Sequence, residues 1–309
     1  MPNIRALTPA LAEKAGVELN EKPSSIKADL QLIKDWIAKQ PHLRARTDDQ
    51  WLVAFLRGCK FSLEKTKEKL DLYYTVRTTL PELYTIKHSD AIFEELYSLG
   101  SMLLLPKTAG PDSPRITLIR PGRFDANKFN VLQMLAVSNV LQKIVLMEDD
   151  HAVIAGTIII LDLQGVSLAH FFQMTPATIK KLVISAQDAS PIRMKGIHCL
   201  NTPPGFETIY NAMKSLLNEK NQNRLYVHNT NYNELYKFVP KEILPSEYGG
   251  SSGTTDGIVG HWKKKVSDYS SFLEEDQKYG TDELRRLKVK PVENGTLGIE
   301  GSFRQLAVD

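Results

Sequence analysis

The chain has 309 residues, of which 42% are hydrophobic and 24% are charged, a composition that supports a large buried core and excludes a disordered or collagen-like protein. Its 39 Lys and Arg residues against 36 Asp and Glu residues give a net charge of +3. That balance excludes nucleic-acid binding through overall charge and requires any electrostatic function to be local.

Two further features of the sequence indicate the cellular compartment of the protein. The two cysteines, Cys59 and Cys199, lie far apart in the sequence, which excludes a disulfide framework and a cysteine-rich metal site. The strongest apolar run, residues 152–161, is half of the roughly 20 residues that a membrane-spanning helix needs, and residues 1–20 contain no apolar signal segment. We therefore expect a soluble cytoplasmic protein.

Residues 24–99 carry helical signals. Leu30, Ile33 and Ile37 fall on one face of a first segment, and a later segment begins after Ser62 and stops at Pro81. Short amphipathic helices with brief connections predict a small helical bundle, which we assign to residues 1–95.

Beyond residue 104, short β-branched runs alternate with helical stretches. Such alternation predicts an α/β domain, over residues 96–250, with a largely parallel sheet covered by helices. We expect residues 251–309 to form a Gly/Ser/Thr-rich linker, one helix over 262–275 and a tail. The predicted strands cover residues 115–119, 157–161, 196–200 and 224–228, and the predicted helices cover 128–147, 175–187 and 206–218.

Four sequence blocks carry a family resemblance. Residues 55–61 read FLRGCKF, 160–165 read ILDLQG, 188–201 read DASPIRMKGIHCLN and 244–250 read LPSEYGG. In this order and spacing they resemble the CRAL-TRIO (Sec14-like) lipid-binding family, over about residues 23–272. The branch most like this chain contains tocopherol-transfer and retinaldehyde-binding proteins, especially arthropod members. The resemblance implies an N-terminal helical domain followed by a lipid-binding α/β domain with a mobile gate helix.

The segment over 206–217 places its apolar residues on one helical face. The stripe consists of Phe206, Ile209, Tyr210, Met213, Leu216 and Leu217. Periodicity alone favours a helix that faces the core. The resemblance instead implies a gate over a lipid pocket, for which residues 203–205 (Pro-Pro-Gly) are either a hinge or simply a turn.

The resemblance also implies a pocket lined by the sheet and by two helices. Lys143 is the ambiguous residue, because a buried lysine is costly unless it is paired. A solvated Lys143 is favoured over one that meets a polar ligand head group, and a Schiff base with retinal is a remote third alternative. The predicted ligand-binding residues are Leu132, Ala136, Asn139, Val140, Lys143, Leu161, Phe171, Phe172, Met174, Ile179, Leu182, Val183, Ile197, Phe206, Ile209, Tyr210 and Met213.

Basic residues gather between positions 191 and 224, where five Lys or Arg face two Glu. Ordinary solvated charge is one interpretation. The resemblance implies another, a cleft that binds phosphoinositide head groups through convergent N–H donors. Its residues are Arg193, Lys195, Lys220 and Arg224. Where the branch has a second basic residue in its N-terminal signature, this chain departs from it with Cys59, next to Lys60, so the resemblance does not establish a contribution from the helical domain.

Enzymatic interpretations are weaker. Residues 249–253 (GGSSG) match G-x-S-x-G around Ser251, but we expect them in a linker rather than between a strand and a helix. The acidic residues of 148–151 fit solvated side chains at a helix end, and phosphate-loop and dinucleotide motifs are absent. We expect no catalysis, no metal and no cofactor.

Taken with the resemblance, these observations predict a monomeric carrier that holds one hydrophobic lipid (a tocopherol, retinoid, carotenoid or similar molecule) and transfers it at phosphoinositide-containing membranes. It would bind no nucleic acid and would associate with membranes transiently from the cytoplasm. The alternative is a regulatory or adaptor module in which the bound lipid is a signal rather than cargo.

Overall fold

A central sheet organises the computed structural model, which describes residues 2–286. Its strands stand in the order β2-β3-β4-β5-β6; β2 runs antiparallel to β3, and the other neighbouring pairs are parallel. The predicted α/β class is therefore confirmed, with an antiparallel edge strand that the sequence patterns did not indicate. The strands are β2 (Met102–Leu104), β3 (Arg115–Ile119), β4 (Thr157–Asp162), β5 (Met194–Leu200) and β6 (Leu225–Asn229).

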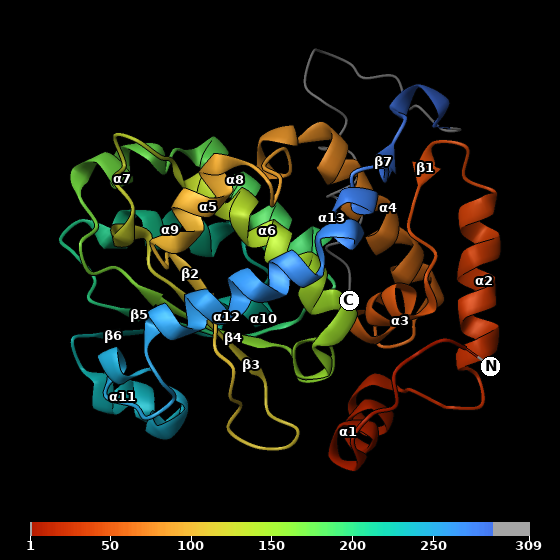
Figure 1. Ribbon diagram of the computed structural model, residues 1–309, viewed down its shortest axis with the longest axis horizontal. Coiled ribbons are helices and arrows are strands. Elements are labelled where there is room, and N and C mark those ends of the chain that lie inside the picture. The colour runs from red at the N-terminus through yellow and green to blue at the C-terminus, as the bar shows by residue number, and fades with distance from the viewer. Residues whose placement is uncertain (1, 287–309) are drawn as a thin grey trace.

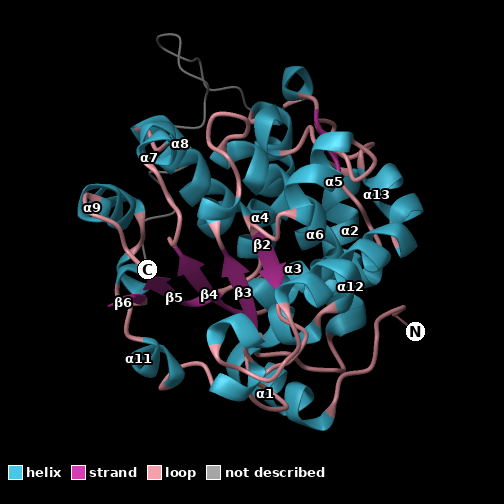
Figure 2. Ribbon diagram, turned by 60° about the vertical axis from the view of Figure 1, so that its left-hand side comes forward, coloured by secondary structure: helices cyan, strands magenta, loops and turns pink. Residues whose placement is uncertain are grey.

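Helices cover both faces of this sheet. Figure 2 shows α7, α8 and α9 on one side of the strands and α11 on the other. Ile116, Leu118 and Ile160 point to the α11 side, where they belong to the same buried core as Leu235 and Leu244. The helices are α5 (Ala91–Ser98), α6 (Val131–Glu148), α7 (Leu168–Gln173), α8 (Pro176–Val183), α9 (Phe206–Leu216), α10 (Glu219–Gln222) and α11 (Tyr232–Tyr236), with π-helical turns at His151–Ala155 and Ile184–Ala189.

Helix α6 lies within this layered structure. By length and composition it could span a membrane, since its mean hydropathy is 1.3 over 18 residues. However, 61% of that stretch is buried inside the fold, as expected for the central helix of a packed domain.

The predicted helical bundle occupies the N-terminal quarter of the chain (Figure 1). Helix α4 starts where the Ser62 side chain accepts a hydrogen bond from the Lys65 amide, and it ends just before Pro81. Trp51, Phe55 and other apolar side chains fill the bundle core, which continues into the end of α6. The bundle helices are α1 (Pro9–Leu19), α2 (Ile26–Ala38), α3 (Asp49–Gly58) and α4 (Leu63–Thr79).

The region after residue 250 differs from the predicted linker and single helix. Gly250 is packed so tightly that a Cβ would lie 2.0 Å from the Leu244 carbonyl oxygen. Helix α12 (Thr255–Asp268) begins seven positions before the predicted helix start at 262, and α13 (Ser270–Asp276) follows it. Strand β7 (Gly280–Thr281) then pairs with β1 (Leu43–Arg44) of the bundle, as the neighbouring blue and orange segments of Figure 1 show. Residues 287–309 of the predicted tail lie outside the described residues.

One buried carboxylate joins three loops at the carboxyl end of the sheet. Asp162 ends β4 and is 5% exposed. It accepts hydrogen bonds from the Gln164 amide at 3.0 Å, from Asn201 Nδ2 at 2.8 Å and from the Tyr248 hydroxyl. Charge-assisted bonds of this kind are stronger than neutral ones, so Asp162 fixes the loops that follow β4 and β5 against the segment before α12.

Replacing this carboxylate should destabilise the whole fold. Asp162→Ala leaves the Tyr248 hydroxyl and two nitrogen donors without their acceptor, so the free energy of unfolding should fall by about 3 kcal/mol. Urea unfolding followed by tryptophan fluorescence measures the change. Asp268→Ala, which removes an exposed carboxylate paired with Lys264, should cost less than about 1 kcal/mol. Equal effects of the two substitutions would contradict the role assigned to Asp162.

Acidification should weaken the fold through a histidine pair on the α11 side of the sheet. His198 Nδ1 lies 2.8 Å from His228 Nε2, and burial followed by the His228 charge lowers the pKa of His198 from 6.5 to about 4. The folded state therefore binds fewer protons than the unfolded chain, so stability is full above pH 6.5 and is lost as the pH falls toward 4. Urea unfolding across this range should show a shallower decline for His198→Phe; an equally steep one would assign the titration to another group.

Candidate ligand cavity and basic cluster

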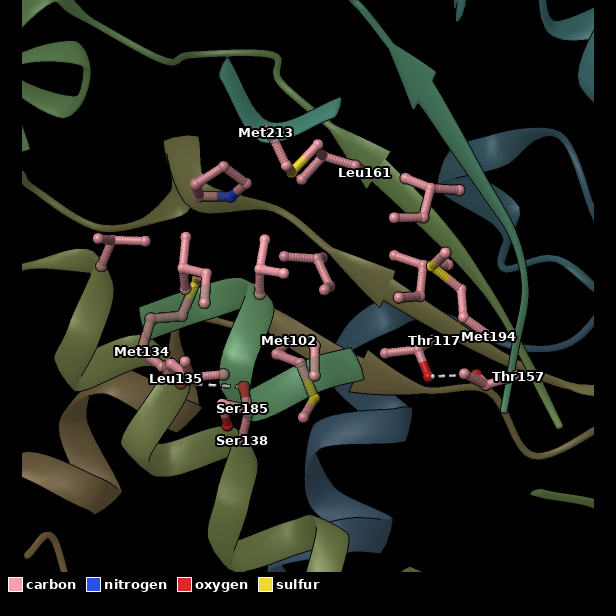
Figure 3. Close-up of a pocket in the computed structure, with 18 of the residues that line it drawn as sticks. Met102, Thr117, Met134, Leu135, Ser138, Thr157, Leu161, Ser185, Met194 and Met213 are labelled. Carbon is pink, nitrogen blue, oxygen red and sulfur yellow. Dashed lines mark hydrogen bonds between the residues drawn. The ribbon is translucent and has the colours of Figure 1, made fainter. Parts of the chain in front are cut away.

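A cavity of about 350 Å³ lies between the sheet and helices α6, α7, α8 and α9. Alternate strand residues form one wall, because successive side chains of a strand point to opposite faces: Thr117 on β3, and Thr157 and Leu161 on β4. Figure 3 shows Leu161 and Met213 on one side of the space, with Met134, Leu135 and Ser138 opposite. A sheet face and a layer of helices therefore enclose most of the cavity, and loop residues such as Phe124, Ile192 and Pro203 complete the lining.

Many of the predicted ligand-binding residues do line this space. They come from both predicted helices, from the sheet and from the predicted gate. They are Asn139, Leu161, Phe171, Met174, Leu182, Val183, Ile197, Phe206, Ile209 and Met213.

On α6, the predicted face is wrong by about one residue position. Leu132 packs with Leu80 and Leu83 instead, and Ala136 and Val140 are buried in the core outside the cavity. The cavity face of α6 is formed by Val131, Met134, Leu135, Ser138, Asn139, Gln142 and Val145.

The predicted ligand-binding residues between 171 and 183 come from two helices, since α7 ends before Met174 and Pro176 starts α8 within the helix predicted over 175–187. The break between the two helices leaves Phe172 on the outer side of α7 with 80% of its surface exposed, and Ile179 is buried away from the cavity. Tyr210 also lies outside the lining, where its ring packs on Phe206 at 5.5 Å between centroids.

Lys143 neither reaches solvent nor faces the cavity. It is 7% exposed, and its Nζ lies 2.9 Å from Asp276 Oδ2 of α13, which also binds Arg77 at 2.7 Å. Burial opposes ionisation of Asp276, but the charges of Lys143 and Arg77 hold its pKa below the usual value. This buried cluster joins α4, α6 and α13. The prediction of a solvated Lys143 is therefore wrong, and so is the alternative in which Lys143 contacts the ligand.

The polar side chains in the lining are engaged with the protein. Arg115, the single formally charged group among the described lining residues, binds Asp149 at 2.6 Å. The Thr117 and Thr157 hydroxyls lie 3.1 Å apart, and Asn139 Nδ2 donates to the Leu83 carbonyl at 2.9 Å. A hydrophobic and uncharged molecule suits such a lining, because the charged side chain in it is already paired and needs no charged group from a ligand.

Helix α9 covers one side of the cavity and packs against α8. Ile209 and Met213 point inward, while Glu207, Thr208 and Asn211 on its outer face are exposed. At its far end the Gln187 side-chain oxygen accepts from the Asn218 amide at 3.1 Å and from Asn221 Nδ2 at 2.8 Å. Gly205 precedes α9 with a φ of 84°, and a Cβ at this position would have no heavy atom within 4 Å, which fits both the hinge and the simple turn that the sequence allows.

The four predicted phosphoinositide-binding residues lie close enough to act on one another. Burial, and then the charges of Arg224 and Lys60, lower the pKa of Lys220. Burial and the charge of Arg224 also lower the pKa of Arg193. Lys60, from the bundle, therefore joins the group. We call Lys60, Arg193, Lys195, Lys220 and Arg224 the basic cluster.

Comparison with known proteins decides the family. Residues 102–250 match the CRAL/TRIO domain, and residues 22–90 match the Pinta-like UBA domain. Alpha-tocopherol transfer protein-like from Homo sapiens is 34% identical over 253 residues, which are 81% of this chain and 73% of the relative. The chain belongs to the CRAL-TRIO family. Clavesin-2 from Homo sapiens is 28% identical over 301 residues, 93% of this chain and 86% of the relative.

A solved structure, "Crystal structure of Sfh5", aligns with 85% of this chain and 100% of its own chain at 14% identity, with a TM-score of 0.46. CRAL-TRIO proteins bind and transfer lipids and are not enzymes as a family. The position of Ser251 in this CRAL-TRIO chain agrees with that: it follows the 3-10 turn Ser246–Tyr248 rather than a strand and donates to the Glu242 carbonyl at 3.2 Å. Within residues 2–286, no group of three His, Cys, Asp or Glu residues could hold a metal.

The sequence patterns missed several lining residues of this CRAL-TRIO cavity. Met102 and Leu104 come from the unpredicted strand β2, and Ser185 comes from a π-helical turn. Thr117 and Ile119 could have been found, because they alternate along a strand that was predicted at its observed bounds.

Proposed function

We propose that this CRAL-TRIO protein carries one uncharged hydrophobic lipid in the cavity and exchanges it at phosphoinositide-containing membranes. The cavity carries the proposal: its volume of about 350 Å³ falls in the usual range for small-molecule sites, and its polar side chains are already bonded within the protein. A tocopherol, a retinoid or a carotenoid has the matching chemistry, and the name of the human tocopherol transfer protein-like relative supports the first.

Exposed apolar side chains beside the cavity support a membrane-facing surface. Leu168 and Phe172, one turn apart on α7, are 73% and 80% exposed, and Leu216 near the end of α9 is 44% exposed. Both helices also line the cavity from their inner sides. Interfacial insertion of such side chains would bring the lipid and the bilayer into contact without a membrane-spanning helix.

The basic cluster supplies the charge for this encounter. Five cations whose charges act on one another suit a polyphosphorylated head group, and Lys220 lies only a few residues beyond the gate helix α9. Binding there that differs between closed and open states would favour release of the lipid. The protein would act as a monomer that associates with membranes transiently from the cytoplasm, without catalysis or cofactor.

Filling the cavity should block lipid uptake. Met213→Trp adds an indole on the inner face of α9 and should lower the affinity for a fluorescent tocopherol or retinoid by about tenfold. Leu216→Trp adds the same group on the exposed side and should leave the affinity unchanged. Organic extraction followed by mass spectrometry of the purified wild type identifies the lipid, and failure to bind any tocopherol, retinoid, carotenoid or phospholipid would contradict the proposal.

Charge reversal in the basic cluster should weaken membrane association. Lys220→Glu with Arg224→Glu should reduce binding to phosphatidylcholine vesicles that contain phosphatidylinositol bisphosphate by about tenfold or more, because attraction becomes repulsion. The matched control, Lys214→Glu with Lys237→Glu, makes the same charge change at exposed positions outside the cluster. Vesicle flotation measures membrane binding by both double variants. Equal losses of binding would show that general surface charge, and not the basic cluster, attracts the membrane. Binding of the lipid without transfer between vesicles would favour the regulatory alternative.

A further inference from the structure

Glu18 is the one carboxylate that reaches the basic cluster among the described residues. Its two oxygens lie 3.4 Å from Lys195 Nζ and 3.2 Å from Lys14 Nζ. Burial alone would raise the pKa of Glu18, but hydrogen bonding to Lys14 and the charge of Lys195 outweigh it and lower the pKa. Glu18 is therefore ionised at neutral pH and acts as an anion bound within the cluster.

Helix α1 holds this carboxylate in place. Leu11, Ala15 and Leu19 are buried against Ile154 of the π-helical turn that precedes β4. The Ile154 carbonyl in turn accepts a hydrogen bond from Arg193. A second tether, Lys14 Nζ to Asp112 Oδ2 at 2.9 Å, fixes the same helix. The position of Glu18 next to Lys195 is thus set by packing and not by a flexible arm.

The dipole of helix α1 does not stabilise the negative charge of Glu18. It stands in the last turn, where the helix dipole disfavours negative charge. Its favourable partners are Lys14 on the same helix and Lys195 on β5, and its charge also acts on Arg193. The remaining members of the basic cluster form no ion pair with a carboxylate in the described part of the chain, so the neutralisation is partial and centred on Lys195.

We infer that Glu18 is a resident counter-anion of the basic cluster, which an inositol polyphosphate head group must displace from Lys195 in order to bind. This inference rests on the proposed function and adds its regulation: α1 sets how much anionic lipid is needed before the protein binds a membrane. A head group that carries several phosphates replaces the single carboxylate with more contacts, whereas Glu18 competes as an intramolecular group at high effective concentration.

Removal of the carboxylate should strengthen membrane binding. Glu18→Gln should lower the apparent Kd for phosphatidylcholine vesicles with phosphatidylinositol bisphosphate by about three- to tenfold, because Lys195 no longer has an internal partner. The matched control is Glu13→Gln, which removes an exposed charge from the same helix and should change the Kd by less than about twofold. Soluble inositol trisphosphate, added as a competitor, should displace the protein from the vesicles if the head group and not the bilayer surface occupies the cluster.

A double-mutant cycle tests whether Glu18 acts through Lys195. In a Lys195→Gln background, Glu18→Gln should gain little or nothing. A full gain in that background, or equal gains from Glu18→Gln and Glu13→Gln, would overturn the inference and leave the proposed function intact. If neither the wild type nor Glu18→Gln binds the vesicles, the phosphoinositide part of the proposed function fails as well; binding by Glu18→Gln alone supports both. Glu18→Ser is a second variant for use if Glu18→Gln folds poorly. Thermal unfolding shows whether each variant is folded.

Discussion

The buried carboxylate of Asp162 is the contact on which the arrangement of the sheet domain depends. Its three donors, Gln164, Asn201 and Tyr248, come from the ILDLQG, DASPIRMKGIHCLN and LPSEYGG blocks, the segments through which the sequence resembles its family. These blocks are distant in sequence and meet around one charge. A buried carboxylate needs several donors to be tolerated, and each of the three blocks supplies one of them.

Helix α9, which covers the cavity, is held by weaker interactions than the carboxyl end of the sheet. Asp162 and the Asp276 cluster hold their elements by buried charged hydrogen bonds, whereas α9 is held by Phe206, Leu217 and the polar side chain of Gln187. Few buried contacts and an exposed outer face are the properties of a segment that opens locally at low cost. The same distribution of contacts is the one that the proposed gating by α9 requires.

The parallel strands β3, β4, β5 and β6 were predictable from short apolar runs, and β3 begins and ends at the predicted residues. The edge strand β2 was missed, because its three residues are too few to show a pattern. The orientation of α6 was not predictable, since this helix is apolar nearly all round and its periodicity does not identify the cavity face. The partner of Lys143 could not be predicted either. Asp276 lies in a segment without any local pattern that connects it to α6, and only the return of the chain through α12 and α13 brings the two together.

The assembly of the basic cluster depends on the fold in a way that the sequence could not supply. Lys60 comes from the helical bundle and the other cationic residues of the basic cluster come from the sheet domain, so the cluster forms only where the two regions meet. Gly58 marks this junction, because a Cβ there would lie 2.3 Å from the Pro191 carbonyl oxygen. Lys220 follows α9 by a few residues, so the cluster lies beside the end of the helix that covers one side of the cavity. The short connection along the chain keeps the two features adjacent.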